Sequence, residues 1–219
     1  TITSWRNIWI YISIIVLIFL PLTSFFLIKK LKLDSRENST EDLVSENSNI
    51  KQWSRSEVLK DYRFYIISLN MLSLPSIATG VFVYQSFILT SKNWGPYIMA
   101  QSFMAYSVLS VITLSISGFL IDKYSSRKLL IFMNIPLFMS AIILHSFNSP
   151  YSSFIFLGLI GISNGFANVL GSSTWAEIYG VKYIGSIKAL TSGLMVFATA
   201  VGTAVFGILI DYGYTINSI

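Results

Sequence analysis

The sequence contains no cysteine, a single histidine and few charged residues, and these shortages narrow what the protein can be. Without cysteine the chain has no disulfide, no thiolate metal site and no cysteine nucleophile. Charged residues make up 11% of its 219 residues, whereas about 25% is usual for a soluble globular chain. So few charges leave too little polar surface to keep a chain of this size in water. We therefore predict that its solvent is the lipid bilayer.

The net charge of +5 does not predict a nucleic-acid partner, because the charges are confined to short segments between apolar runs. No residue pattern calls for a cofactor or a metal, and we predict neither.

Hydrophobic residues make up 53% of the chain and gather in six long runs. A helix needs about 20 mostly apolar residues to cross a bilayer. No Asp, Glu, Lys or Arg lies inside these runs, as hydrocarbon requires. We therefore predict an all-α membrane protein with six transmembrane helices, at Ile8–Ile28, Phe64–Thr90, Tyr97–Ile121, Leu129–Phe147, Phe154–Ala176 and Ala189–Ile210.

The basic residues predict the orientation of these helices. Counted over alternate connectors, 13 Lys and Arg residues fall on one side and two on the other. By the positive-inside rule the side with 13 is cytoplasmic. We therefore predict a multi-pass protein of a bacterial inner membrane or a plasma membrane, with its long central loop in the cytoplasm.

Three regions follow from this pattern. Residues 1–28 form one helix, residues 29–63 form a polar cytoplasmic linker, and residues 64–219 form a bundle of five helices. The linker carries eight basic and seven acidic residues around a Ser/Asn-rich middle, too little apolar area to fold alone.

The connector after the third apolar run contains a motif, Gly118-Phe-Leu-Ile-Asp122-Lys123-Tyr-Ser-Ser-Arg127-Lys128. It resembles the pattern G-x-x-x-D-[RK]-x-G-x-[RK]-[RK] of the major facilitator superfamily, as found after the eighth helix, with Ser125 where the family usually has glycine. A second copy of its first part, Gly207-Ile-Leu-Ile-Asp211, ends the last run on the opposite side, as expected of inverted repeats.

This resemblance implies that the chain is the carboxy-terminal portion of a twelve-helix carrier, from the sixth helix to the eleventh. The last helix and most of the amino-terminal half would then be missing. The stretch Trp175–Leu190 is similar to the loop before the eleventh helix in the monocarboxylate-transporter-like and oxalate-formate-antiporter-like branch. The resemblance also implies a gating role for the motif, with Asp122 near the start of the eleventh helix, close to Ser186. Glu177 is expected to pair with Lys182 or Arg127.

Polar residues within the apolar runs are candidates for the solute path. We predict that Tyr84, Gln85, Asn164 and Asn168 line it, with Gln101 as a further candidate. For the two asparagines, hydrogen bonding between helices is an equally good interpretation. Gly161 and Gly165 have the small-xxx-small spacing that allows close helix packing.

The predicted function is secondary active transport of a small solute, by symport or antiport and alternating access, with a mono- or dicarboxylate as a candidate. Its partners would be the solute, the bilayer and the amino-terminal half. One alternative is an intramembrane serine hydrolase, since Gly161-Ile-Ser163-Asn-Gly165 fits G-x-S-x-G. A base within reach of Ser163 would be needed, and His145, the sole histidine, lies earlier in the chain. A receptor or assembly protein that does not transport is the other alternative.

Overall fold

The computed structural model describes residues 13–14, 16–18, 21 and 51–218. The chain divides into two units, Thr1–Ser48 and Asn49–Ile219, which we describe separately. In the first unit the described residues are helical and fall within the predicted helix at residues 8–28. The rest of that predicted helix, and residues 29–50 of the predicted linker, lie outside the described residues.

The second unit is built from helices, and its described residues contain no strand, which confirms the predicted all-α class. Helices α4, α6, α9 and α10 contain 22 to 28 residues and are long and apolar enough to cross a membrane. At 1.5 Å per residue such helices extend about 33 to 42 Å, more than the roughly 30 Å of a hydrocarbon core. The elements are α3 (Arg55–Val58), α4 (Tyr62–Val83), α5 (Gln85–Ser91), α6 (Ile98–Tyr124), α7 (Ser126–Leu129), α8 (Ile135–Ser146), α9 (Ser152–Tyr179) and α10 (Ile184–Asp211).

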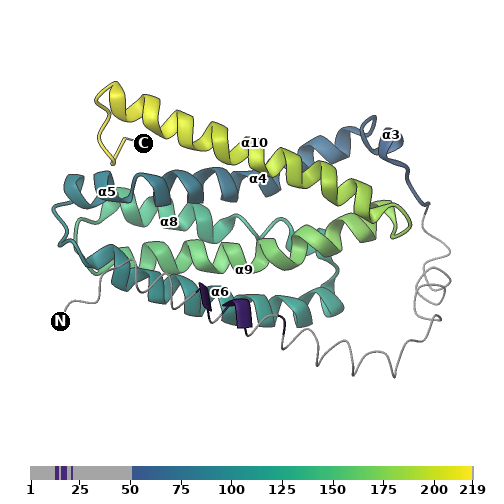
Figure 1. Cartoon of the computed structure of the whole chain (residues 1–219), viewed down its shortest axis with the longest axis horizontal. Coiled ribbons are helices and arrows are strands. Elements are labelled where there is room, and N and C mark those ends of the chain that lie inside the picture. The colour runs from purple at the N-terminus through teal and green to yellow at the C-terminus, as the bar shows by residue number, and fades with distance from the viewer. Residues whose placement is uncertain (1–12, 15, 19–20, 22–50, 219) are drawn as a thin grey trace. The chain divides into compact units, whose positions relative to one another are not determined.

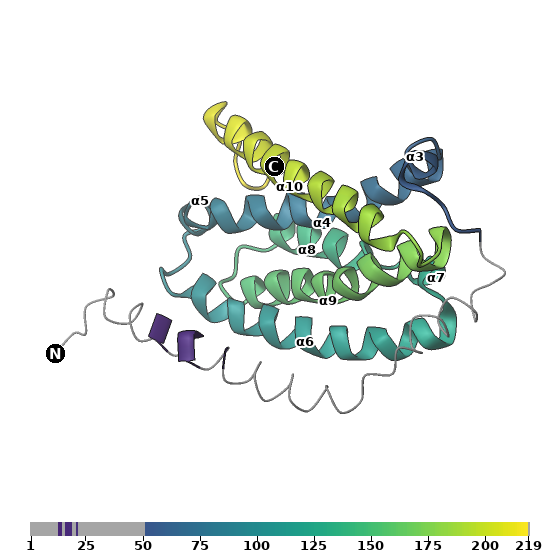
Figure 2. The same ribbon diagram turned by 45° about the vertical axis from the view of Figure 1, so that its right-hand side comes forward.

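Helix α9 is central to the second unit and contacts α4, α6, α7, α8 and α10. Helix α10 packs mainly against α4. Figures 1 and 2 show α6 and α10 on opposite sides of the bundle, with α4 and α9 between them.

Glycines allow the closest approaches between these helices. A Cβ atom placed at Gly165 of α9 would lie 2.7 Å from the Ser110 carbonyl oxygen of α6, and one at Gly161 would meet the Tyr106 backbone. The close packing predicted from the spacing of these two glycines is thus confirmed. Gly202 has the same role on α10, where a Cβ would lie 2.8 Å from the Cα of Ser76 on α4.

Two predicted spans are divided in the structure. The span at 64–90 breaks at Tyr84, where α4 ends and α5 begins. The span at 129–147 contains a series of turns over residues 130–134, and α8 starts only at Ile135. Pro136 lies at the start of α8, where its missing N–H leaves no helical hydrogen bond unmade. The Asn134 Nδ2 donates to the Asn70 carbonyl of α4 over 2.9 Å, which anchors these turns.

The end of the predicted linker is folded against the bundle. Helix α3 begins with a capping box in which the Ser54 N–H donates to the Glu57 carboxylate over 2.8 Å. Hydrogen bonds from the Ser54 backbone and hydroxyl, together with Lys51, lower the pKa of Glu57 to about 2. Val58 of α3 is fully buried, and the Trp53 N–H donates to the Tyr179 carbonyl of α9 over 3.0 Å. The part of the linker nearest α4 is therefore a docked element.

Candidate functional site

A cleft of about 450 Å³ lies between α4, α6, α9 and α10. Clefts of roughly 300–1,000 Å³ are the usual size of small-molecule sites. Much of the wall is apolar and comes from α4 and α10, including Leu72, Pro75, Ala78, Phe82, Leu194 and Met195. The cleft can therefore accept a small solute with an apolar body.

Helix α9 presents a row of polar residues to this cleft. Asn164, Asn168 and Ser172 are four residues apart and share one helix face. The Asn164 Nδ2 donates to the Ser110 hydroxyl of α6 over 3.0 Å, and the Asn168 Nδ2 donates to the Asn164 carbonyl over 2.8 Å. The structure thus places both predicted asparagines in the cleft, and Asn164 also makes the interhelical bond given as the alternative.

Ser68 of α4 contributes an unsatisfied hydroxyl to the cleft wall. Its side chain is only 6% exposed, and its Oγ has no hydrogen-bond partner among the described residues. Leaving a buried hydroxyl unpaired costs about 1–3 kcal/mol. A polar group of a molecule bound in the cleft would supply the hydrogen-bond partner that the Ser68 hydroxyl lacks.

Lys188 of α10 is the charged residue of the cleft, and no other charged residue lines it in the described part of the chain. Its Nζ lies 3.4 Å from the Ser172 Oγ, its sole hydrogen-bond partner among the described residues. The sequence predicts a last helix that begins at Ala189, which places Lys188 in the connector before it. In the structure α10 begins at Ile184, so Lys188 lies inside the helix.

The other predicted path residues lie away from this cleft. Tyr84 sits at the α4–α5 break, and its ring stacks on Phe206 of α10 with centroids 6.5 Å apart. Gln85 is half-buried at the start of α5, and Gln101 is exposed on α6. None of the three lines the cleft that contains the asparagines.

One end of the bundle carries most of the basic residues of the described part, and we call it the basic end; it includes Lys123, Arg127, Lys128 and Lys182. Glu177 at the end of α9 is the central acceptor there. It receives hydrogen bonds from the Ser125 hydroxyl at 2.6 Å, from the Ser126 N–H at 2.9 Å and from the Ser126 hydroxyl. The Arg127 Nε lies 3.2 Å from the same carboxylate, so Glu177 pairs with Arg127, one of the two expected partners.

Ser125 occupies the position where the superfamily pattern usually has glycine. Its backbone has φ 72° and ψ 141°, a region that is essentially restricted to glycine. The hydrogen bond from its hydroxyl to Glu177 offsets part of the strain of this conformation. The structure therefore explains both why glycine suits this turn and how serine is accommodated.

The remaining motif residues face outward. Asp122, Lys123 and Lys128 are exposed, and Asp122 has no hydrogen bond or ion pair with the described residues. The expected contact between Asp122 and the start of α10 is not formed in this arrangement. A Cβ at Gly118 would meet no described atom within 4 Å, so the surface from Gly118 to Asp122 is open.

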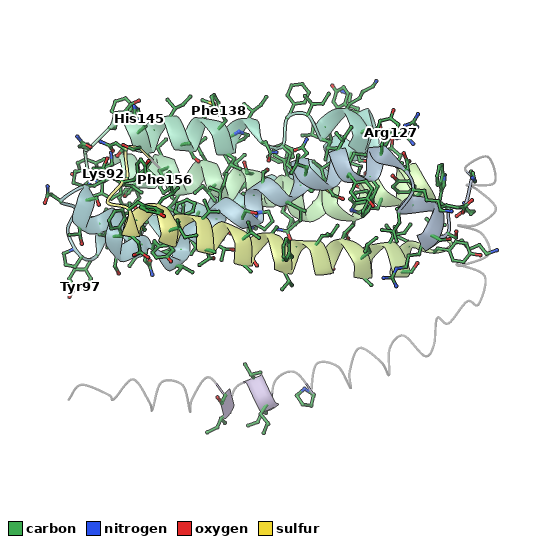
Figure 3. The ribbon with its side chains drawn as sticks, turned by 90° about the horizontal axis from the view of Figure 1, so that it is seen from above. Lys92, Tyr97, Arg127, Phe138, His145 and Phe156 are labelled. Carbon is green, nitrogen blue, oxygen red and sulfur yellow. The ribbon has the colours of Figure 1, made fainter. Side chains whose placement is uncertain are left out.

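The opposite end of the bundle is held by hydrogen bonds between two connectors. Figure 3 shows Lys92, Tyr97 and His145 at this end and Arg127 at the basic end. The Lys92 Nζ donates to the Asn148 Oδ1 over 2.9 Å, and the Trp94 Nε1 donates to the Asn148 carbonyl over 2.7 Å. Burial lowers the pKa of Lys92.

Within residues 51–218, Ser163 and His145 each hydrogen-bond to a backbone carbonyl and do not bond to each other. Ser163 is fully buried, and its hydroxyl donates to the Met133 carbonyl over 3.1 Å. His145 is 2.7 Å from the Asn217 carbonyl through its Nδ1. Neither residue is partnered by the other in the described part of the chain.

Four long apolar helices in the described part of the chain, around a cleft with one polar face, are typical of a multi-pass membrane protein. A family model described as Major Facilitator Superfamily matches residues 1–214. The chain therefore belongs to this superfamily, whose members are secondary transporters of small solutes. Comparisons with curated proteins and with solved structures found no match.

Proposed function

We propose that the cleft between α4, α6, α9 and α10 is part of the solute path of a secondary transporter, and that the basic end faces the cytoplasm. The observation that carries this proposal is the row of polar α9 residues in a cleft whose other walls are mainly apolar. The solute would be a small molecule, with a mono- or dicarboxylate as the candidate class. Similarity to the monocarboxylate-transporter-like and oxalate-formate-antiporter-like branch supports this class.

In this proposal the chain is the carboxy-terminal portion of the carrier and rocks against an amino-terminal half about a shared site. The wall of the cleft formed here would be completed by helices of that half. Tyr84, Gln85 and Gln101 would contact the solute only in another conformation, since none of them lines the present cleft.

These 219 residues contain no cysteine, so a cysteine introduced here is the sole thiol in this part of the carrier, and any cysteine of the proposed amino-terminal half is replaced first. In the intact carrier, Asn168→Cys should react with a membrane-impermeant maleimide added on the side of the basic end. Val111→Cys is a matched control, since Val111 is 65% exposed on the apolar surface of α6. If the two cysteines react at the same rate, the cleft is not a water-accessible path.

We also propose that Gly118, Asp122, Lys123, Arg127 and Lys128 gate the basic end. The open surface at Gly118 and the unpaired Asp122 carboxylate leave this face free to contact a part of the carrier beyond the described residues. Asp122→Asn should then weaken the closed state and speed the labelling of Asn168→Cys from the basic end. Asp211→Asn, at the other end of the bundle, is the control; an unchanged rate for Asp122→Asn would remove Asp122 from the gate.

A further inference from the structure

The cleft has a chemical asymmetry that indicates what kind of solute it receives. Lys188 and Ser172 lie in the part of the cleft nearest the basic end, whereas Phe82 and Tyr106 contribute aromatic rings to its wall. From Asn164 to Ser172 the polar row extends eight residues along α9, which corresponds to about 12 Å.

Lys188 has no acidic partner in this cleft. No Asp or Glu is among the described residues that line it, and the 3.4 Å contact with the Ser172 hydroxyl is long for a hydrogen bond. A lysine ammonium has three donors and no acceptor. At least two of its donors therefore remain available to a ligand.

Neighbouring groups add further donors. The Ser192 hydroxyl of α10 lines the cleft without a partner in the described part of the chain, and the Ser68 hydroxyl is buried and unpaired. Because the buried Ser68 hydroxyl has no hydrogen-bond partner among the described residues, a ligand oxygen would improve its hydrogen bonding. The unpaired Ser68 hydroxyl thus indicates a ligand independently of the charge on Lys188.

We propose that Lys188 and the Ser172 hydroxyl form an anion-binding site in the cleft, which takes the carboxylate of a solute whose apolar body lies along α4 and α10. This inference rests on the proposed solute path and assigns the residues that would hold the carboxylate. The remaining wall of the cleft is mainly apolar, so an inorganic oxyanion bound to Lys188 would have unpaired charged oxygens facing that wall. A carboxylate with an apolar body is therefore favoured.

The test uses Asn168→Cys as a reporter in the intact carrier. Acetate, butyrate, benzoate and octanoate are the probes, each compared with its uncharged amide, and inorganic phosphate is included as the alternative oxyanion. We expect at least one carboxylate to slow maleimide labelling of the reporter, while its amide does not. Lys188→Ala should weaken the apparent affinity for that carboxylate by about tenfold or more, as expected when a charged hydrogen-bond partner is lost.

Two further variants separate a binding role from a structural one. Lys188→Arg keeps the charge and should retain protection by the carboxylate. Lys182→Ala removes a nearby exposed lysine that does not line the cleft, and should leave protection unchanged. Protection that is equal in Lys188→Ala, protection by amides as strong as by carboxylates, or protection by phosphate alone would each overturn the proposal.

A second measurement distinguishes failure of this site from failure of the path. The thermal unfolding midpoint of the unlabelled carrier should rise with the effective carboxylate, and should not rise in Lys188→Ala. A rise that depends on Lys188, together with an unreactive Asn168→Cys, would retain the anion site and reject the path. A reactive reporter with no carboxylate effect in either assay would retain the path and reject the anion site.

Discussion

The contact between α9 and α6 predicts that one added methyl group at Gly161 is destabilising. A Cβ at this position would lie 3.0 Å from both the Cα and the carbonyl carbon of Tyr106, and closer still to the carbonyl oxygen. These are backbone atoms, so no side-chain rotation relieves the clash. Ordinary contact begins at 3.4 Å, so the difference from 3.0 Å requires α6 to retreat by at least 0.4 Å.

The size of the effect follows from two opposing contributions. Alanine is favoured over glycine in a helix interior by about 0.8–1.0 kcal/mol. Forcing an extra methyl into a tightly packed contact costs about 1–3 kcal/mol, and a gap of about 0.5 Å already forfeits a quarter of the dispersion energy of the separated atoms. Subtracting the gain in helix propensity from the cost of the clash leaves a net decrease of up to about 2 kcal/mol in the free energy of unfolding of Gly161→Ala.

Gly171→Ala is the matched control on the same helix. A Cβ at Gly171 would meet nothing within 4 Å, so this variant has the gain in helix propensity without the clash. The difference between the two variants therefore isolates the cost of the clash, about 1–3 kcal/mol. Unfolding in mixed micelles, followed by tryptophan fluorescence, measures both free energies. Equal changes in the two variants would refute the packing argument.

Three other predictions concern the ends of the bundle. Ser125→Ala should lower the free energy of unfolding by about 1–3 kcal/mol, because it keeps the strained φ and loses the hydroxyl bonded to Glu177. Ser125→Gly relieves the strain and should be close to neutral. Equal melting temperatures for these two variants would contradict this prediction. Lys123→Cys and Tyr151→Cys should react with impermeant maleimide from opposite sides of the membrane, Lys123→Cys from the cytoplasm; labelling of both from one side would reject the orientation. The depressed pKa of Glu57 means that its stabilising contribution to α3 is complete above the ordinary pKa of 4.5 and is lost progressively as the pH falls to about 2. Tryptophan fluorescence, compared between the parent protein and Glu57→Gln, follows this loss. A transition at pH 5 or higher would contradict the prediction.

The contacts of Glu177 show that the sequence predicts a charge pair, whereas the fold determines which partner is used. The sequence offered Lys182 and Arg127 as partners for Glu177, and the structure selects Arg127. It also adds two serine hydroxyls and a backbone N–H, at the turn where Ser125 replaces glycine. The motif after α6 is therefore bonded to the end of α9, the helix that carries Asn164 and Asn168.

The sequence by itself determined the class of protein, the approximate positions of α6, α9 and α10, and the packing role of Gly161 and Gly165. These properties are local: hydrocarbon excludes charge from each apolar run, and small residues at helical spacing leave room for a neighbour. The superfamily motif is likewise contained in one short segment.

Only the tertiary structure decided which polar residues share a cleft. Hydropathy places Lys188 in a connector because it shows where charge is absent, but it does not show that the helix begins earlier, at Ile184. Likewise, Tyr84 and Asn164 are both polar residues in apolar runs, yet only Asn164 lines the cleft. Which side chains meet depends on which helices are neighbours, and that is determined by packing between residues far apart in the chain, such as Ser126 and Glu177, which are separated by 51 positions.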